Sequence, residues 1–407
     1  MFKRICLLLF SVFSLLGYKA VIVEPVVDFM GNWTSDFGKN SDFYYQQPCS
    51  PQSGFTCSRI YQGLFNEVVD VIEENGDECK FHYGAVFYLK EGKIPCDEFY
   101  ALKKYLKPIS EFDINVFPEM PNYKTNHKFS NSDEIVLIQP FSVQLNDKKV
   151  IFSPGTRFKI DTTFGGNVAY KAYSLNDILF VPMELALQFV NQEISNEGRI
   201  ADFIKLLQLW ANSGDYFASK DYFTPYVYGG SSGLPMHIGA KFKLVQDGDK
   251  SYWDYPDNKG TLKSGFDCSA LICRAAQTIG LPFYFRNTTT IKAYLHSINS
   301  DDFEIENGDI IFFVGHVLVI SDVQQNKCIH ANGYSSGYGC VVESELKDIF
   351  KDINTFNDLN SAYFNKSGLN LLDKSGKVVR FVPEFSILKF MSSNQMLNQV
   401  QHDGGAQ

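Results

Sequence analysis

The first half of the chain alternates between apolar and polar residues in short stretches, which turn-forming Gly, Asn, Asp and Pro separate. Such alternation is typical of strands with one buried face. It predicts two small β-barrels, at residues 21–97 and 135–190, joined by a helix and a polar linker at residues 98–134. The helix is expected over Asp97–Ile109, ended by Pro108.

The second half mixes helical and strand patterns. Apolar residues recur every three to four positions in "GRIADFIKLLQLWANS" (residues 198–213), which predicts a helix. Strands and further helices follow, so residues 191–391 are expected to form one larger domain ahead of a polar tail at residues 392–407. Together the patterns indicate an α+β protein.

The N-terminus has the pattern of a secretory signal peptide over residues 1–20. Lys3 and Arg4 precede an apolar run, Ile5–Leu16, that is short for a bilayer-spanning helix. A membrane anchor is the alternative interpretation. With the signal removed, we expect a periplasmic or secreted protein without integral membrane association.

Composition narrows the function classes. Hydrophobic residues make up 45% of the 407 residues, which supports folded cores, and the net charge of −9 argues against nucleic acid as a partner. One or two disulfides are expected among four cysteines of the N-terminal quarter, with the pairing open: Cys49, Cys57, Cys79 and Cys96. The sequence has no CxxC pair and its histidines are scattered, so no metal and no cofactor are expected.

One cysteine stands where a loop turns into a helix. In "SGFDCSALICRAAQTIG" (residues 264–280), Cys268 begins a run of apolar residues at helical spacing, Asp267 suits the N-cap, and Gly280 suits the C-terminal end. The helix N-terminus lowers the pKa of a thiol, whereas the charge of Asp267 raises it, so a reactive thiolate needs a basic partner as well. The alternative interpretation of Cys268 is a small core residue.

Two histidines downstream provide such a partner. The segment "NGDIIFFVGHVLVISDVQQNKCIHANG" (residues 307–333) predicts three strands joined by turns. A register that pairs Ile320 with Asn326 places His316 opposite His330, with Cβ atoms about 4.5–5.5 Å apart. His316 is then a candidate base, and His330 a candidate for the group that orients it.

These segments, taken with an upstream tyrosine stretch, resemble the NlpC/P60 family of papain-like cysteine peptidases. The matching motifs occur in the family's order: Y-x-[WY]-G-G at residues 226–230, D-C-S-[GA]-[LF] at 267–271, G-D-[IL]-I-F-F at 308–313 with G-H-V at 315–317, and [FI]-H-A at 329–331.

The resemblance implies a papain-like catalytic domain preceded by two small SH3-like β-barrels. It implies that Cys268 is the nucleophile, His316 the general base and His330 the third catalytic residue. The backbone N–H of Cys268 would help form the oxyanion hole, with the hydroxyl of Tyr226 beside it. The implied substrates are peptidoglycan-derived peptides, cut between γ-D-glutamate and the diamino acid that follows.

The resemblance also assigns a role to the residues on either side of the cysteine. In the family branch that cuts γ-D-glutamyl bonds, an Asp and a Ser there bind the free amine of the substrate's L-Ala, and this chain has Asp267 and Ser269. The chain departs from the pattern in an insertion of about thirty-five residues, Gly230 to Gly265, which is a candidate cover for the cleft.

Two other functions fit the same residues. An acyltransferase or amidase would use the same cysteine and histidines with another acceptor. A catalytically inactive wall-binding protein would bind through the barrels alone.

Overall fold

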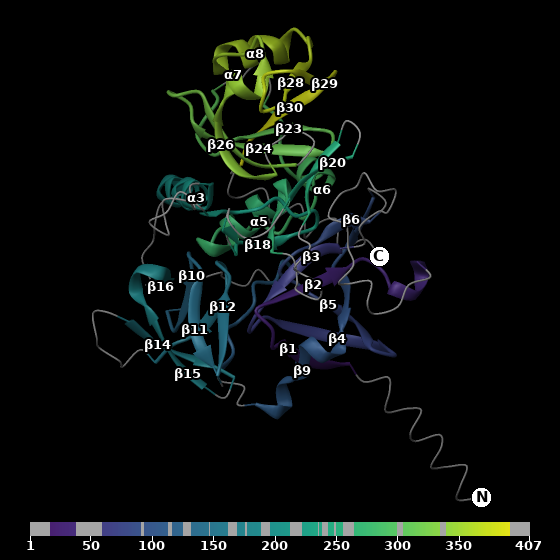
Figure 1. The fold of residues 1–407 in the computed structure, drawn as a ribbon, viewed down its shortest axis with the longest axis vertical. Coiled ribbons are helices and arrows are strands. Elements are labelled where there is room, and N and C mark those ends of the chain that lie inside the picture. Colours follow the sequence, from purple (N-terminus) through teal and green to yellow (C-terminus); the bar gives the residue numbers. More distant parts are fainter. Residues whose placement is uncertain are drawn as a thin grey trace, which may run out of the picture.

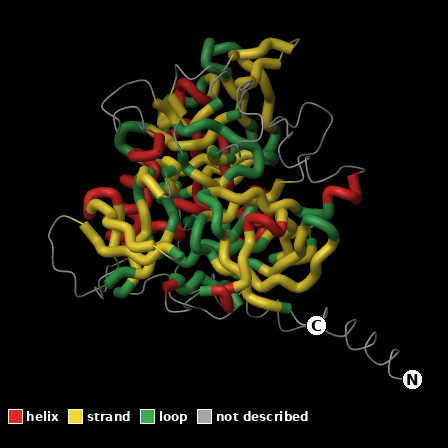
Figure 2. Tube along the Cα trace, turned by 60° about the horizontal axis from the view of Figure 1, so that its bottom comes forward, coloured by secondary structure: helices red, strands yellow, loops and turns green. Residues whose placement is uncertain are grey.

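The structure is a computed structural model in which strands predominate (Figure 2). It describes residues 17–37, 59–90, 93–112, 116–124, 132–145, 147–161, 169–175, 177–188, 196–211, 222–234, 236–237, 243–247, 250–254, 264–298, 304–333 and 339–390. In this described part, no helix has both the length and the apolar character to cross a bilayer. Most of the predicted signal peptide, together with Cys49 and Cys57, lies outside these residues.

The N-terminal region forms a seven-stranded sheet. Its strands are β1 (Tyr18–Ile22), β2 (Val26–Met30), β3 (Arg59–Leu64), β4 (Val68–Asn75), β5 (Glu78–His82), β8 (Glu98–Leu102) and β9 (Leu106–Pro108), and a separate hairpin joins β6 (Tyr88–Lys90) to β7 (Ile94–Cys96). The order across the sheet is β3-β2-β8-β5-β4-β1-β9. Buried aromatic rings fill its core, among them Phe29, Phe81 and Phe99.

The helix predicted over Asp97–Ile109 is wrong, since this segment holds β8, a 3-10 turn and β9. β8 lies in the middle of the sheet, where Phe99 pairs with Phe81 of β5. Burial between two partner strands outweighs the helical spacing of the apolar residues. The structure also places Tyr18 to Ala20 inside β1, so a signal cleaved after Ala20 would remove three of the five residues of that strand.

The second region consists of three small sheets. They contain β10 (Glu134–Leu137), β11 (Phe141–Leu145), β12 (Lys148–Phe152), β13 (Arg157–Lys159), β14 (Ala169–Ser174), β15 (Asp177–Pro182) and β16 (Ala186–Gln188), in the orders β13-β10-β16, β11-β12 and β14-β15. They share one apolar core around Phe152 and Phe158. The described strands do not close into a barrel in either region, so the two SH3-like barrels stay a prediction.

The third region combines helices with a five-stranded antiparallel sheet. It contains α3 (Asn196–Ala211), α5 (Cys268–Thr278), α6 (Thr288–Tyr294), and the strands β23 (Ile310–Phe313), β24 (His316–Asp322), β25 (Lys327–Asn332), β26 (Cys340–Glu345) and β30 (Phe385–Leu388). The sheet order is β26-β25-β24-β23-β30, and α5 packs on β24 and β25. The predicted helices at residues 198–213 and after Cys268 correspond to α3 and α5.

Short strands precede α5 in the chain. The segment that precedes Cys268 carries β17 (Tyr222–Phe223), β18 (Ser231–Ser232), β19 (Met236–His237), β20 (Lys243–Asp247), β21 (Lys250–Asp254) and β22 (Gly265–Phe266). β18 pairs with β22, and β20 pairs with β21 as a hairpin inside the insertion noted in the sequence. Whether the insertion covers the cleft depends on residues outside the described ranges.

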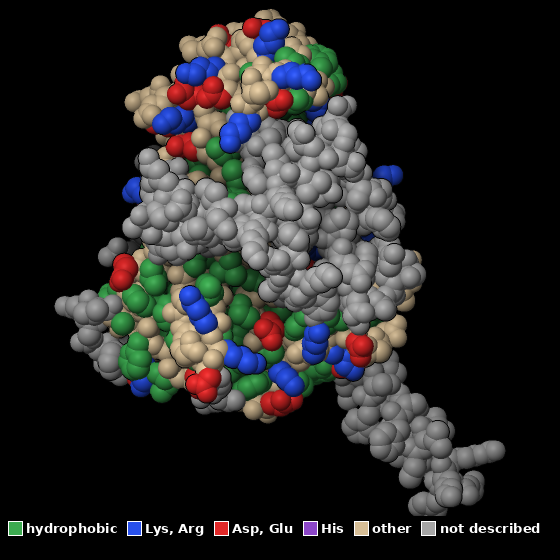
Figure 3. All heavy atoms as spheres, in the orientation of Figure 1, with side chains coloured by type: hydrophobic (Ala, Val, Ile, Leu, Met, Phe, Trp, Pro, Cys, Tyr) green, Lys and Arg blue, Asp and Glu red, His purple; other side chains and the backbone are tan. Residues whose placement is uncertain are grey.

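A compact unit stands between β26 and β30, at the top of Figure 1. It comprises α7 (Leu346–Ile349), β27 (Phe350–Lys351), α8 (Phe356–Phe364), β28 (Leu369–Leu372) and β29 (Val378–Val382). The order of its sheet is β27-β28-β29, which leaves β29 at an edge, and a second apolar core joins the unit to the five-stranded sheet. Over the described surface of the face in Figure 3, basic and acidic side chains are intermixed.

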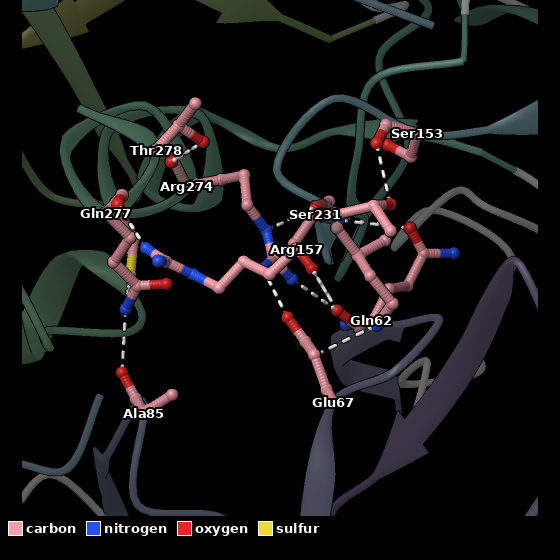
Figure 4. A network of polar contacts seen from close by, with 12 residues as sticks. Gln62, Glu67, Ala85, Ser153, Arg157, Ser231, Arg274, Gln277 and Thr278 are labelled. Carbon is pink, nitrogen blue, oxygen red and sulfur yellow. Dashed lines mark hydrogen bonds and ion pairs between the residues drawn. The ribbon is translucent and has the colours of Figure 1, made fainter. Parts of the chain in front are cut away.

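A buried polar network joins the three regions (Figure 4). Arg274 of α5 donates to the carboxylate of Glu67 at 2.7 Å and to the backbone oxygen of Gln62 at 2.9 Å. Gln277, one turn later, donates to the backbone oxygen of Ala85 and accepts from Arg157 of β13 at its own backbone oxygen. Both N-terminal regions are therefore bound directly to the helix that begins at Cys268.

Candidate active site

Cys268 is the first residue of α5, as the sequence predicted. Asp267 is the N-cap, and its carboxylate accepts from the backbone N–H of Ala270 at 2.9 Å. The side chain of Cys268 is 7% exposed, and the helix that begins with it is buried along its whole length.

The surroundings of Cys268 favour the neutral thiol. Burial is the larger cause and the charge of Asp267 the next, and together they raise the pKa of the Cys268 thiol to about 12. The backbone N–H groups of Val317 and Ser269 and the cation of Arg286 act in the opposite direction. Desolvation therefore outweighs the effect of the helix start on the pKa of this thiol, and a basic partner is needed for the thiol to react as a thiolate.

The two predicted histidines meet. Nε2 of His316 lies 2.9 Å from Nδ1 of His330, which is hydrogen-bond distance, and the rings cross at 66°. Nδ1 of His316 is the ring nitrogen that this contact leaves for another partner. The backbone N–H of Val317, which follows His316 in the chain, hydrogen-bonds toward the sulfur of Cys268, so both histidines and the cysteine share one site.

The register that brings the histidines together differs from the predicted one. Ile320 pairs with Cys328, and a bulge lies between Ile320 and Asp322. Continued along the strands, this register sets His330 opposite Leu318 rather than His316. The shift is two residues, so both histidines stay on the same face and become diagonal neighbours that imidazole rings can bridge.

Both imidazoles are neutral at pH 7, because their pKa values are lowered. Burial, followed by the charge of Arg380, lowers the pKa of His316 to about 4, and Asp267 acts in the other direction. Burial also places the pKa of His330 well below its usual value. Nε2 of His330 has no hydrogen-bond partner among the described residues.

Tyr226 lies close to the start of α5. It bridges to Phe266 in the strand before Cys268, and the pKa of its hydroxyl is raised by burial, by Cys268 and by Asp267. The Gly-Gly turn that follows has a steric reason. Gly229 has φ +72°, and a Cβ there would lie 2.3 Å from the backbone oxygen of Arg59, so only glycine fits.

Asp267 is fully engaged by groups of the protein itself. Arg286 forms an ion pair with both of its oxygens, and the Ser269 hydroxyl donates to it at 3.0 Å. The backbone N–H of Gly229 donates to it at 3.0 Å, in addition to the capping bond from Ala270. Because a carboxylate has about four acceptor positions, a substrate amine would have to displace one of these donors.

Arg286 and three residues of β3 are functional candidates that the sequence analysis missed. Arg286 donates to the backbone oxygen of Ile60, and Arg59, itself paired with Asp28, donates to the backbone oxygen of Tyr228 at 3.1 Å. Gln62 exchanges hydrogen bonds with Ser231 in both directions. Strand β3 thus holds the loop that carries Tyr226 and the Gly-Gly turn, a long-range contact that no sequence pattern reveals.

The described cysteines form no disulfide. Cys79, Cys96, Cys268, Cys273, Cys328 and Cys340 are all free thiols. Any disulfide of the N-terminal quarter would therefore have to involve Cys49 and Cys57, which lie outside the described residues.

The described fold is similar to that of a solved NlpC/P60 family protein from Bacillus cereus. The TM-score is 0.52 at 14% sequence identity, and the match covers 81% of this chain and 94% of the other. The chain has the NlpC/P60 fold. Since residues 191–407 are little more than half of the chain, a match of this extent includes N-terminal regions as well.

Two further solved structures align with lower scores. An NlpC/P60 endopeptidase from Photobacterium damselae has a TM-score of 0.43 at 8% identity, over 91% of this chain and 73% of its own. A peptidoglycan hydrolase from Mycobacterium tuberculosis has a TM-score of 0.24 at 18% identity, over 39% and 68%. Neither adds to the conclusion on fold. No protein-family model and no curated protein matches the sequence.

Proposed function

We propose that this protein is an exported cysteine endopeptidase that hydrolyses the bond between γ-D-glutamate and a diamino acid in cell-wall peptides. The observation that carries the proposal is the contact between His316 and His330 beside Cys268, at the start of a buried helix, in the NlpC/P60 fold. A nucleophile, a base and a group that orients the base are the parts that acyl transfer needs.

In the proposed reaction, the thiol proton passes to His316 as the sulfur attacks the carbonyl carbon of γ-D-glutamate. The backbone N–H of Cys268 donates to the resulting oxyanion, beside the hydroxyl of Tyr226. His316 then protonates the amine of the diamino acid as the C–N bond breaks, which leaves a thioester. Water, deprotonated by His316, hydrolyses the thioester and restores the thiol.

The acceptor of the acyl group distinguishes this proposal from an acyltransferase. Defined muropeptides incubated with the protein should give two fragments whose masses sum to substrate plus water. A product that carries another acceptor in place of water would identify a transferase. Cys268→Ala should abolish turnover while its circular dichroism spectrum stays that of the wild type, and turnover in that folded variant would exclude Cys268 as nucleophile.

The rival of another class is an inactive protein that binds cell wall through SH3-like N-terminal regions. It predicts binding to insoluble murein without any cleavage product. The contact between His316 and His330, next to the hydrogen bond from the backbone N–H of Val317 to Cys268, supports the enzyme.

Amine recognition by Asp267 and Ser269 also remains a proposal, and Arg286 competes with it. Comparison of kcat/KM for a peptide with a free L-Ala amine and its N-acetylated form tests it. Equal values would restrict Asp267 to capping α5 and pairing with Arg286.

A further inference from the structure

Arg380 extends from the unit between β26 and β30 to the turn that precedes His316. It lies in the middle of β29, an edge strand whose first four residues are exposed. Its guanidinium donates to the backbone oxygen of Val314 at 3.0 Å, in the turn directly before His316. The sequence analysis did not single it out, because β29 lies more than sixty residues from that turn.

Three groups are layered at this point. The guanidinium of Arg380 lies over the ring of Phe313 at 5.9 Å, and that ring lies 5.4 Å from the imidazole of His316. Phe313 is 1% exposed and pairs with His316 across the turn, so both rings are fixed by the sheet. The exposed cation therefore has a defined position next to the candidate base.

No carboxylate of the described residues forms an ion pair with Arg380. Its charge acts on His316 instead, as one of the causes that lower the pKa of that imidazole. Asp267 acts on the pKa of His316 in the opposite direction, and His330 is the hydrogen-bond partner of His316. The backbone N–H of Val317, the residue after His316, hydrogen-bonds to the thiol of Cys268. A cation with no carboxylate partner beside a base is a site for an anion supplied by a ligand.

The proposed chemistry indicates which part of the substrate comes here. His316 must come within hydrogen-bond reach of the leaving amine in order to protonate it. The carbon bonded to that amine nitrogen carries the α-carboxyl group of the leaving diamino acid. We propose that Arg380 binds a carboxylate of the leaving residue, an assignment that rests on the proposed function.

The leaving diamino acid can present two carboxylates to Arg380, namely its α-carboxylate and, in diaminopimelate, its side-chain carboxylate. Synthetic peptides that carry only one of them distinguish the two. L-Ala-γ-D-Glu-L-Lys has only the α-carboxylate on its leaving residue, its C-terminal amide has none, and a diaminopimelate peptide amidated at the α-carboxyl has only the side-chain carboxylate. Wild type should cleave at least one carboxylate peptide with a kcat/KM about ten- to hundred-fold above that of the amide, the range of a charge-assisted hydrogen bond. The favoured peptide identifies the carboxylate.

Arg380→Gln should remove this preference at pH 7 and leave the rate on the amide peptide within about twofold. Arg380→Lys should retain part of the preference, since it keeps the charge without the planar fork. Lys377→Gln, which removes one charge from the same hairpin, is the matched control and should behave as wild type. Arg380→Gln should also move the acid limb of kcat/KM on the amide peptide to higher pH, because the cation that lowers the pKa of His316 is gone.

Each contrary result has its own meaning. An equal loss on all three peptides would make Arg380 a structural or purely electrostatic residue and overturn the assignment. A preference that survives in Arg380→Gln would place the carboxylate elsewhere, again against it. If wild type cleaves none of the peptides, the proposed function itself fails, and the assignment fails with it. The urea midpoint of Arg380→Gln, expected to equal that of wild type, separates these results from misfolding.

Discussion

Asp267 precedes the candidate nucleophile and opposes its ionisation, yet it also caps the helix on which that nucleophile stands. Both effects arise from one buried carboxylate. Arg286 compensates its charge and lowers the pKa of the Cys268 thiol in turn. At the scale of single residues, the site therefore holds a protonated thiol beside a neutral imidazole, and proton transfer has to accompany attack on a substrate.

The alkylation rate of Cys268 should report this protonation state. With a thiol pKa of about 12, the thiolate fraction rises about tenfold for each pH unit across the neutral and moderately alkaline range. We expect the rate with iodoacetamide, followed by mass spectrometry of the peptide containing Cys268, to rise steadily from pH 7 to pH 10. A plateau near neutral pH would indicate a preformed thiolate and contradict the prediction.

The two histidines should differ in their effects on turnover. His316→Ala removes the base and should lower kcat by about 10²–10⁴-fold, while His330→Ala removes only the group that orients it and should cost less. Because the base acts when neutral, kcat/KM should rise as the pH increases through about 4, the pKa of His316, and then stay level toward neutrality. A larger loss at His330 would reverse the roles of the two histidines. An acid limb near pH 6.5 would contradict the lowered pKa of His316.

At the scale of elements, the site depends on where α5 begins and on how β24 and β25 pair. The N-cap residue, Asp267, sets the start of α5 through a pattern that is local in sequence. The bulge near Ser321 sets the pairing of β24 with β25, because it changes the register by one residue between the Asp322–Lys327 pair and the Ile320–Cys328 pair. The resulting register differs by two residues from the predicted one, so His316 and His330 stay on one face. An odd shift would have separated the histidines.

The ion pair between Arg286 and Asp267 should hold the start of α5 in place. Arg286→Leu leaves a buried carboxylate without its cation, and the free energy of unfolding should fall by about 3–5 kcal/mol. Asp267→Asn combined with Arg286→Leu should lose less than the sum of the two single variants, by about 0.5–3 kcal/mol in urea unfolding. Strict additivity would mean that the two side chains do not stabilise each other.

At the scale of the whole molecule, the N-terminal regions are structural parts of the candidate active site. Strand β3 binds the loop that carries Tyr226, and Arg274 of α5 reaches back to Glu67. These contacts are buried, with Arg274 3% and Glu67 1% exposed. Buried charges that are paired across regions stabilise one arrangement only as long as both partners are present.

Glu67→Gln should therefore destabilise the protein by about 3–5 kcal/mol, because it leaves the guanidinium of Arg274 buried without a counter-charge. Glu74→Gln is the matched control, since Glu74 and its partner Lys103 are each 39% exposed and should contribute about 0–1 kcal/mol. The urea midpoints of the two variants give the comparison. Similar small shifts would show that the regions fold without the buried pair.

The sequence by itself determined the features that depend on neighbours along the chain. The start of α5 at Cys268, the strands β24 and β25 that carry His316 and His330, and the Gly-Gly turn follow from capping, alternation and turn chemistry, which act over a few residues. The resemblance built on those segments also led to the NlpC/P60 fold.

Only the tertiary structure decided the features that depend on distant partners. Burial raised the pKa of the Cys268 thiol that the helix start alone would lower, and sheet pairing turned the helix expected over Asp97–Ile109 into β8 and β9. Arg286 and Arg380 reached the site from separate segments. Desolvation and long-range pairing depend on the complete fold, so no stretch of sequence contains them.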